Sequence, residues 1–425
     1  MDIERIHQLF LESNGVCTDT RKIKSNTLFF ALKGDNFDGN TYAEQAIKNG
    51  ASYAIIDDKK LPVSEKFILV EDTLKTLQNL ASYHRKHLNI PIIALTGSNG
   101  KTTTKELINC VLSSSYKTTA TSGNLNNHIG VPLTLLSMNE DTEIGIVEMG
   151  ANHLKEIEFL CNIACPDFGY ITNIGKAHIE GFGSLEGVLK GKTELYQYLK
   201  KHNKLIFLNT EDSKLLNASG GIESFTFSQT LDSDITVSLQ GANPMVNVDY
   251  NNNTINSHLI GSYNFTNIAA AIAIGNYFKI NPEQIKTAIE SYIPSNNRSQ
   301  IIEKNESTII LDAYNANPSS MNAAIDNFQQ LKYNNKTVFL GDMFELGDTA
   351  TEEHQKIADK ITETSFNKIY LIGQNFLSTS TEDNRIRKYQ SFEDLKENES
   401  LTKIKDAILI KGSRGMKLER ILDLI

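Results

Sequence analysis

Short apolar runs rich in β-branched residues alternate along this chain with longer segments whose apolar positions recur every three or four residues. The short runs predict buried strands, and the amphipathic segments predict helices. Regular alternation of the two predicts mostly parallel sheets covered by helices, with ligands gathered at the carboxyl ends of the strands. We therefore expect an α/β fold.

The pattern groups into three α/β units, which we expect to be separate domains: residues 1–88, 89–297 and 298–425. In the first unit we expect strands at 27–31 and 54–56 and helices at 42–50 and 74–86. In the second we expect strands at 90–95, 143–148 and 168–173, helices at 101–112, 184–200 and 268–278, and a group of short strands within 209–260. In the third we expect a second open sheet, with strands at 308–312, 337–341, 368–372 and 407–411 and helices at 319–331, 351–362 and 417–424.

The first strand of the second unit runs into a glycine turn and then into a helix. Glycines let backbone N–H groups face a phosphate, and the N-terminus of the following helix favours anions. The lysine and hydroxyl after the second glycine are placed for the terminal phosphates and Mg²⁺. Leu95 replaces the first glycine of the usual motif, so an ordinary turn with a surface lysine is the alternative. The expected phosphate-binding residues are Gly97, Ser98, Asn99, Gly100, Lys101, Thr102 and Thr103.

Further candidate residues follow other strands of the same unit. Glu148 ends the strand at 143–148, where a carboxylate either coordinates the Mg²⁺ of a nucleotide or caps the strand. His178 follows the strand at 168–173, and its place at the same edge of the sheet makes it a candidate although a loop histidine is more often structural. Lys190 and Lys192 lie on the next helix, where solvated side chains are the default.

Composition excludes several classes of protein. A net charge of −9 argues against a general affinity for nucleic acid or anionic membranes. The longest apolar runs are too short to span a membrane, and the N-terminus lacks the pattern of a secretory signal. Four cysteines without metal-ligand spacing fit a reduced setting, so we expect a cytoplasmic protein. We also expect a monomer.

The compact T-G-x-x-G-K-T loop is typical of the superfamily of Mur ligases and folylpolyglutamate synthases, and further segments resemble Mur ligases along nearly the whole chain. Residues 18–21 and 29–39, which by pattern alone are polar turns beside strands, resemble segments that grip the uridine diphosphate end of the substrate in Mur ligases acting at the third and later peptide positions. With residues 121–132, this resemblance implies nucleotide-sugar contacts at Thr20, Asn36, Phe37, Asn124, Asn126 and Asn127.

The resemblance also implies catalytic roles. Several Mur ligases carry a carbamate on a lysine that lies downstream of the histidine and is followed by x-x-x-aromatic, and Lys192 with Tyr196 matches this spacing, whereas Lys190 does not. Carried over, the catalytic residues are Lys101, Glu148, His178, Lys192 and Arg298, and the ligands of two Mg²⁺ ions are Thr102, Glu148, His178 and carbamylated Lys192.

The implied nucleotide site extends beyond the phosphate loop. Asn264 and Asn267 match the H-N-x-x-N segment that lies beside adenine in the family, although Tyr263 replaces the histidine. Arg298 matches a family arginine that follows glycine, here replaced by Asn297, and Asp312 matches an aspartate that faces the ribose.

Residues 312–321, DAYNANPSSM, resemble a segment of the family branch that joins D-alanyl-D-alanine to UDP-N-acetylmuramoyl-tripeptide, and residues 341–347 and 411–414 also fit that branch. The resemblance implies an ATP-dependent, ADP-forming ligase of peptidoglycan precursor synthesis that works through an acyl phosphate. Its acceptor side is expected at Tyr314, Asn315, Asn317 and Ser413.

Other functions remain open. A Mur ligase that adds the third residue is expected to carry a D-N-P-R motif, which this chain lacks. A folylpolyglutamate synthase-like ligase is expected to lack the N-terminal nucleotide-sugar segments, and a non-catalytic binder of UDP-sugars is expected to have lost Lys101 or Glu148.

Overall fold

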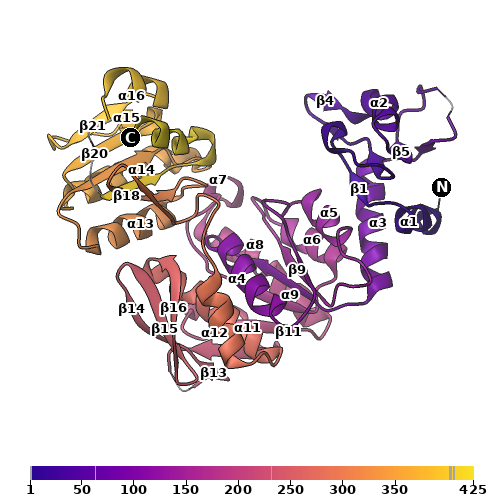
Figure 1. Ribbon diagram of the computed structural model, residues 1–425, viewed down its shortest axis with the longest axis horizontal. Coiled ribbons are helices and arrows are strands. Elements are labelled where there is room, and N and C mark those ends of the chain that lie inside the picture. The colour runs from indigo at the N-terminus through magenta and orange to yellow at the C-terminus, as the bar shows by residue number, and fades with distance from the viewer. Residues whose placement is uncertain (1, 63, 231, 402–403, 405–406) are drawn as a thin grey trace.

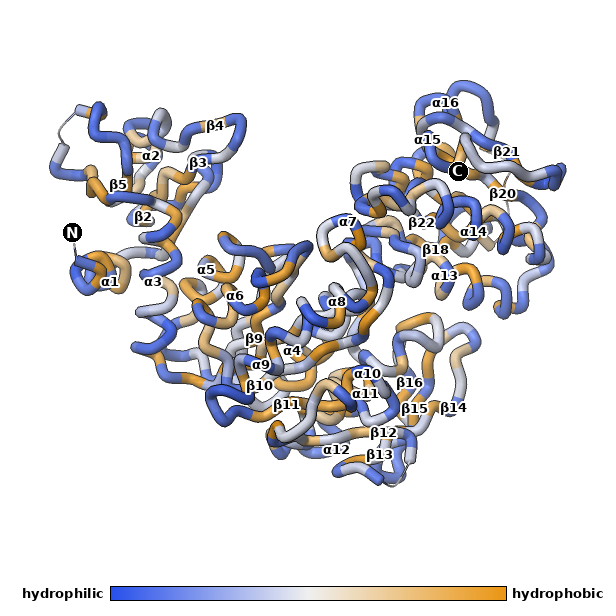
Figure 2. Tube along the Cα trace, turned by 180° about the vertical axis from the view of Figure 1, so that it is seen from behind, coloured by the Kyte–Doolittle hydropathy of each residue, from blue (hydrophilic) through white to orange (hydrophobic). Residues whose placement is uncertain are grey.

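The computed structural model describes residues 2–62, 64–230, 232–401, 404 and 407–425, and within these its elements form three groups along the chain. Both views place the N-terminal and C-terminal groups on opposite sides of the central group (Figure 1; Figure 2). Apolar positions concentrate along the strands, which are buried in each group (Figure 2). Within the described ranges, the helices are too short or too polar to cross a membrane.

The N-terminal group is a small parallel sheet of order β1-β2-β5-β6 with a separate hairpin, β3–β4. Its long last helix, α3, leads into the central group and packs on α5 and α6 there (Figure 1). The elements are α1 (Ile3–Leu11), β1 (Val16–Cys17), η1 (Thr20–Lys22), β2 (Leu28–Phe30), β3 (Lys33–Gly34), β4 (Phe37–Asp38), η2 (Gly39–Tyr42), α2 (Ala43–Lys48), β5 (Tyr53–Ile56), β6 (Phe67–Leu69) and α3 (Thr73–Leu88).

The central group is built on a parallel sheet of order β13-β12-β11-β10-β7-β9-β8. The chain moves from β7 to β8 and β9 on one side and then to β10 on the other, so a crevice for ligands is expected where the direction changes. The elements are β7 (Ile92–Thr96), α4 (Lys101–Ser113), β8 (Thr118–Ala120), α5 (Gly130–Leu135), β9 (Ile144–Glu148), α6 (Glu156–Ala164), β10 (Phe168–Ile171), α7 (Ile179–Phe182), α8 (Leu185–Lys192), α9 (Glu194–Lys201), β11 (Leu205–Asn209), α10 (Ser213–Ala218), β12 (Ser224–Ser228) and β13 (Ile235–Thr236).

An antiparallel sheet of order β14-β15-β16 and two helices complete this group. The first of these helices, α11, is buried around most of its surface and packs against α4 behind the sheet. It thereby fixes the helix that follows the glycine turn. The elements are β14 (Ser238–Ala242), β15 (Met245–Tyr250), β16 (Asn253–Ile260), η3 (Ser262–Asn264), α11 (Phe265–Tyr277) and α12 (Pro282–Ser291).

The C-terminal group is an open sheet of order β17-β18-β22-β19-β20-β21, parallel except for β17 against β18. Successive residues of β18 point into different apolar cores, Ile309 and Leu311 on one face and Ile310 on the other. The elements are β17 (Gln300–Lys304), β18 (Ser307–Asp312), α13 (Pro318–Gln330), β19 (Lys336–Gly341), η4 (Gly347–Thr349), α14 (Ala350–Thr362), β20 (Lys368–Ile372), α15 (Gln374–Leu377), β21 (Ile386–Tyr389), α16 (Phe392–Asn398), β22 (Ala407–Lys411), η5 (Arg414–Met416) and η6 (Leu418–Leu424).

The α/β class and the strands expected from the sequence are confirmed, whereas two expected helices differ. The helix expected at 184–200 is divided into α8 and α9 at Thr193, whose hydroxyl donates at 2.8 Å to the Leu189 O that also accepts from Thr193 N, a contact of the kind that bends helices. The α-helix expected at 417–424 is wrong. Lys417 has φ of 50°, in the left-handed region, and separates the 3₁₀ helices η5 and η6.

Two buried histidines join α1 to α3 at the edge of the N-terminal group. His84 Nε2 lies 2.9 Å from Met138 O and therefore donates to this carbonyl. Its Nδ1 then accepts from His7 Nε2 at 3.0 Å, so the His84 ring is neutral. Burial lowers the pKa of His7 to about 4, aided by His84 and His87, and burial also lowers the pKa of His84.

Acid should therefore loosen this contact between helices. The unfolded chain binds protons near the ordinary histidine pKa of 6.5, whereas folded His7 and His84 exclude them, so the stability they contribute is present above pH 6.5 and is lost as the pH falls toward 4. We expect the melting temperature to fall between pH 7 and 4.5, and less steeply in the double variant His7→Phe/His84→Gln. Exposed His153→Gln is the control, and equal slopes in all three proteins would contradict this account.

Candidate functional site

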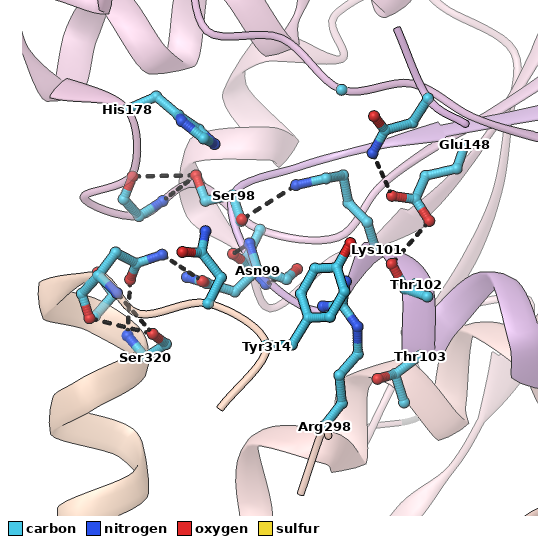
Figure 3. Close-up of a pocket in the computed structure, with 18 of the residues that line it drawn as sticks. Ser98, Asn99, Lys101, Thr102, Thr103, Glu148, His178, Arg298, Tyr314 and Ser320 are labelled. Atoms are coloured by element: carbon cyan, nitrogen blue, oxygen red, sulfur yellow. Dashed lines mark hydrogen bonds between the residues drawn. The ribbon is translucent and has the colours of Figure 1, made fainter. Parts of the chain in front are cut away.

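The carboxyl ends of β9, β7 and β10 are adjacent in the central sheet, and a cavity of about 830 Å³ opens over them. Because β7 ends at Thr96 and β9 at Glu148, the glycine turn and the carboxylate meet at one edge, as the sequence predicted. The loop after β10 brings His178 to the same cavity. The opposite wall comes from the C-terminal group, through residues such as Arg298, Tyr314 and Asn317 (Figure 3).

The glycine turn requires both of its glycines. Gly97 and Gly100 have φ of 143° and 79°, and a Cβ on them would lie 2.0 Å from Thr172 Oγ1 and 2.6 Å from Asn267 Oδ1. Without these side chains the backbone curls closely around the N-terminus of α4, which begins at Lys101. A helix N-terminus at the floor of a polar cavity is a suitable site for phosphate.

Lys101 bends back over this turn, where its Nζ donates to Gly97 O at 2.7 Å. It also donates to Ser98 O at 3.2 Å (Figure 3). Burial lowers the pKa of Lys101, while the nearby carboxylate of Glu148 partly opposes the shift. Phosphate oxygens can replace these two backbone carbonyls as hydrogen-bond acceptors, so the Lys101 ammonium group remains available to an incoming anion.

Thr102 and Glu148 supply adjacent oxygen atoms beside the turn. Thr102 Oγ1 donates to Glu148 Oε2 at 3.0 Å, and Asn126 Nδ2 donates to Glu148 Oε1 at 2.8 Å (Figure 3). A hydroxyl and a carboxylate are the hard oxygen donors that Mg²⁺ uses together with phosphate oxygens and water. These two residues therefore fit a nucleotide-bound Mg²⁺ ion.

The other expected metal ligands are arranged differently. His178, with φ of 54°, contacts the carboxylate of Glu345 from the C-terminal group. This contact lowers the pKa of Glu345, and the charge of Lys101 adds to the shift. In the described part of the chain, no three His, Cys, Asp or Glu side chains come together as a metal site.

Lys192 is fully buried, at 0% exposure, whereas Lys190 is exposed. The Nζ of Lys192 donates to Ala151 O at 2.9 Å and lies 5.1 Å from the centre of the Phe182 ring. Ala151 lines the cavity, so Lys192 lies directly behind the wall. Burial, followed by the charge of Lys101, lowers the pKa of Lys192 well below its usual range. A solvated helix lysine therefore does not describe this residue.

The side of the cavity near α11 carries amide and guanidinium groups. Asn267 accepts from Thr104 Oγ1 at 3.0 Å and donates to Asn264 Oδ1 at 2.8 Å, which fixes both amides against the glycine turn. The Arg298 guanidinium lies 3.7 Å from the centre of the Tyr314 ring (Figure 3). Its Nε is buried and has no hydrogen-bond partner among the described residues, so it can donate to an anion.

Asp312 also lines the cavity, and two neighbouring groups hold its carboxylate in place. Its Oδ2 accepts from Lys411 Nζ at 2.6 Å and its Oδ1 accepts from Ser299 N at 3.3 Å. Ser299 in turn bonds the hydroxyl of Tyr263 at 2.8 Å, so Tyr263, which stands where the family has histidine, supports the junction between the two groups.

Asn317 ties the C-terminal group to the glycine turn. Its Nδ2 donates to Asn99 Oδ1 at 2.7 Å, while its Oδ1 accepts from Ser320 N at 2.9 Å in a capping box at the start of α13. Nearby, Lys176 N donates to Ser319 Oγ at 3.0 Å. The loop tip is therefore held from the opposite side of the cavity.

The structure brings most of the expected site residues into one cavity. Gly97, Lys192 and Ser413 do not line it, and Ser413 instead accepts from Phe344 N at 2.9 Å. Thr20, Asn36 and Phe37 lie in the N-terminal group. The expected residues that line the cavity are Ser98, Asn99, Gly100, Lys101, Thr102, Thr103, Asn124, Asn126, Asn127, Glu148, His178, Asn264, Asn267, Arg298, Asp312, Tyr314, Asn315 and Asn317.

Sequence reasoning missed further residues of the wall, notably Glu156, Phe159, Glu345 and Lys411. Glu345 and Lys411 lie in the segments 341–347 and 411–414, which the resemblance had singled out without giving these side chains a role. Glu156 and Phe159 lie on α6, where nothing in the helical pattern distinguishes them from surface residues.

Models of one family match most of the chain. The Mur ligase family catalytic domain matches residues 12–85, the Mur ligase middle domain residues 95–275, and the Mur ligase glutamate ligase domain residues 297–414. The UDP-N-acetylmuramoyl-tripeptide–D-alanyl-D-alanine ligase of Bacillus subtilis strain 168 is 38% identical over 431 residues, which cover 97% of this chain and 93% of that protein.

Solved structures agree over nearly the full length. A crystal structure of MurF from Acinetobacter baumannii superposes with a TM-score of 0.86 at 28% identity, covering 98% of this chain and 97% of that one. The MurF ligase of Thermotoga maritima in complex with ADP superposes with a TM-score of 0.84 at 25% identity, with the same coverage of both chains.

The contact between Asn317 and Asn99 should order the glycine turn. In Asn317→Ser the new hydroxyl still caps α13, but it is too short to reach Asn99. We expect faster amide hydrogen exchange in residues 97–101 with little change in melting temperature. Asn322→Ser, which alters an amide bonded to Pro318 O within the same helix, is the control. Unchanged exchange in Asn317→Ser would refute the coupling.

Proposed function

The chain belongs to the Mur ligase family, and we propose that it joins D-alanyl-D-alanine to UDP-N-acetylmuramoyl-tripeptide while ATP is cleaved to ADP and phosphate. One observation carries this proposal: the segment that begins at Asp312 and resembles the dipeptide-adding branch lines the same cavity as the phosphate loop. The likeness over nearly the full length to ligases of this kind supports it.

The chemistry requires activation, because a carboxylate and an amine do not condense in water. ATP phosphorylates the terminal carboxylate of the tripeptide, and the acyl phosphate formed loses phosphate when the dipeptide nitrogen attacks its carbonyl carbon. Phosphoryl transfer depends mainly on positioning and on neutralising the charge of the phosphate oxygens.

The residues of the cavity fit these tasks. The N–H groups at the start of α4 and the Lys101 ammonium face the β- and γ-phosphates, and the unpartnered Arg298 Nε donates from the opposite wall. Thr102 and Glu148 would hold Mg²⁺, which would neutralise charge on the phosphate oxygens. Asn264 and Asn267 are proposed to lie beside adenine and Asp312 to face the ribose, as the family resemblance implies, and all three line the cavity.

We propose a second Mg²⁺ site that uses Glu148, His178 and carbamylated Lys192. A carbamate requires a neutral amine to react with CO₂, and the burial of Lys192 favours that form. The product turns a cationic side chain into an anionic oxygen ligand, which suits a hard cation. His178 has to turn from Glu345 or share its ring between the two partners.

The substrates are proposed to enter from both ends of the molecule. Thr20, Asn36 and Phe37 contact the nucleotide-sugar, and the side chain of Phe37, 56% exposed on the β3–β4 hairpin, offers an aromatic face to uracil. Asn124, Asn126 and Asn127 then guide the substrate toward the phosphate loop. Tyr314, Asn315 and Asn317 line the acceptor side, where Ser413 acts only through the loop it supports.

These assignments correspond to three working domains: residues 1–88 for the UDP-sugar, 89–297 for ATP, and 298–425 for the acceptor and for closing over the site. Closure keeps water from the acyl phosphate. We further propose that the protein acts in the cytoplasm as a monomer, without nucleic acid or membrane partners, in line with its composition.

Comparing different acceptor substrates tests the proposed function directly. With the purified tripeptide nucleotide, ATP and Mg²⁺, D-alanyl-D-alanine should drive phosphate release, and free diaminopimelate, lysine or glutamate should not. Lys101→Ala should reduce turnover by about 100-fold or more, because a contact that strengthens in the transition state is lost. Efficient turnover with a single amino acid on a dipeptide-bearing nucleotide would instead indicate the third-residue ligase.

Lys192 provides a separate test, whose readout does not depend on turnover. Protein equilibrated with ¹³C-bicarbonate should show a carbamate carbon signal by NMR, and this signal should be absent from Lys192→Ala. The variant should also lose activity, and short carboxylic acids such as acetate should partly restore it by occupying the vacant ligand position. Lys190→Ala is the matched control, since that side chain is exposed. A wild-type spectrum without the carbamate signal would rule the modification out.

A further inference from the structure

Glu345 differs from the other carboxylates that line the cavity in the described chain. Glu148 accepts from Thr102 and Asn126, Glu156 accepts from the backbone N–H groups of Asn152 and His153, and Asp312 is paired with Lys411. Glu345 contacts only the imidazole of His178 among its recorded partners, and its side chain is 49% exposed. It is therefore the cavity carboxylate best able to take a new cationic partner.

An unusual backbone conformation determines the position of the Glu345 carboxylate. Glu345 has φ of 62°, a left-handed conformation that is unfavourable for a residue with a Cβ. The preceding residues hold the turn in place, because Met343 N donates to His354 Nε2 and Phe344 N donates to Ser413 Oγ, both at 2.9 Å. Backbone strain that the surroundings maintain is a feature of functional sites.

The charged residues that line the cavity bear on where an ammonium group can bind. Lys101, Arg298 and Lys411 make the surroundings of the phosphate loop suitable for phosphates and carboxylates but repel an ammonium group. Glu345 faces this region from the C-terminal group, and its loop contacts the central group where Glu180 N donates to Glu345 O at 3.3 Å. An ammonium bound to Glu345 would therefore lie at the border of the phosphate site.

We propose that Glu345 binds the α-ammonium group of the acceptor dipeptide and so places its nitrogen next to the activated carboxyl group. The inference rests on the proposed ligase function, and it gives the acceptor end of the cavity its anionic partner. A charge-assisted hydrogen bond of this kind fixes both the position and the orientation of the ammonium group. Ser413 and His354 then act as positioning residues for the loop.

A pair of nucleophiles tests this assignment. Hydroxylamine is neutral near pH 7 and traps an acyl phosphate as a hydroxamate, so it needs no carboxylate to bind it. Glu345→Gln should raise the KM for D-alanyl-D-alanine by about tenfold or more, while the KM for ATP and the rate of hydroxamate formation stay near those of the wild type. Glu345→Asp, which keeps the charge, should recover part of the affinity.

Asp348→Asn is the matched control, an exposed carboxylate on the same loop that does not line the cavity. An unchanged KM for the dipeptide in Glu345→Gln would overturn the assignment. Loss of hydroxamate formation together with peptide formation would also overturn it, because Glu345 would then act on phosphoryl transfer through His178. A wild-type protein that forms neither product with the tripeptide nucleotide would instead refute the ligase function itself.

Discussion

Parallel pairing of β7 between β9 and β10 is the constraint on which the rest of the site depends. It brings the phosphate loop, Glu148 and the His178 loop to one edge, although they are far apart in the sequence. Helix α4 completes the arrangement, because α11 buries it from behind and leaves its N-terminus facing the cavity. A change that disturbed this packing would displace the phosphate loop and the proposed metal ligands together.

The second determinant is the contact between the central and C-terminal groups. Asn317 reaches the tip of the phosphate loop, Lys176 pairs with Glu353 at 2.7 Å, and Glu345 contacts His178. These contacts are polar, and Ile260 of β16 adds an apolar contact because it packs into a core of the C-terminal group. An interface made mainly of polar contacts is compatible with the closure that we propose for the C-terminal domain.

The sequence predicted what depends on local pattern. Alternating apolar runs gave the strands, and the spacing of Gly97, Gly100 and Lys101 gave the phosphate loop, because backbone geometry there leaves few alternatives to glycine. The break at Thr193 was not predicted, since it depends on one hydroxyl that bonds to its own helix. The burial of Lys192 was also invisible to the helical pattern, because it follows from the packing of α8 behind Ala151.

Glu345 shows why the acceptor side was harder to predict than the nucleotide side. Phosphate recognition uses backbone N–H groups and one lysine at fixed spacing, so it leaves a motif in the sequence. Recognition of an ammonium group needs only one carboxylate, which any loop can present, and its direction here comes from a left-handed turn held by Ser413 and His354. On the proposed assignment, binding of the acceptor by Glu345 depends on tertiary contacts of the C-terminal group, whereas the phosphate loop is recognisable from a local motif.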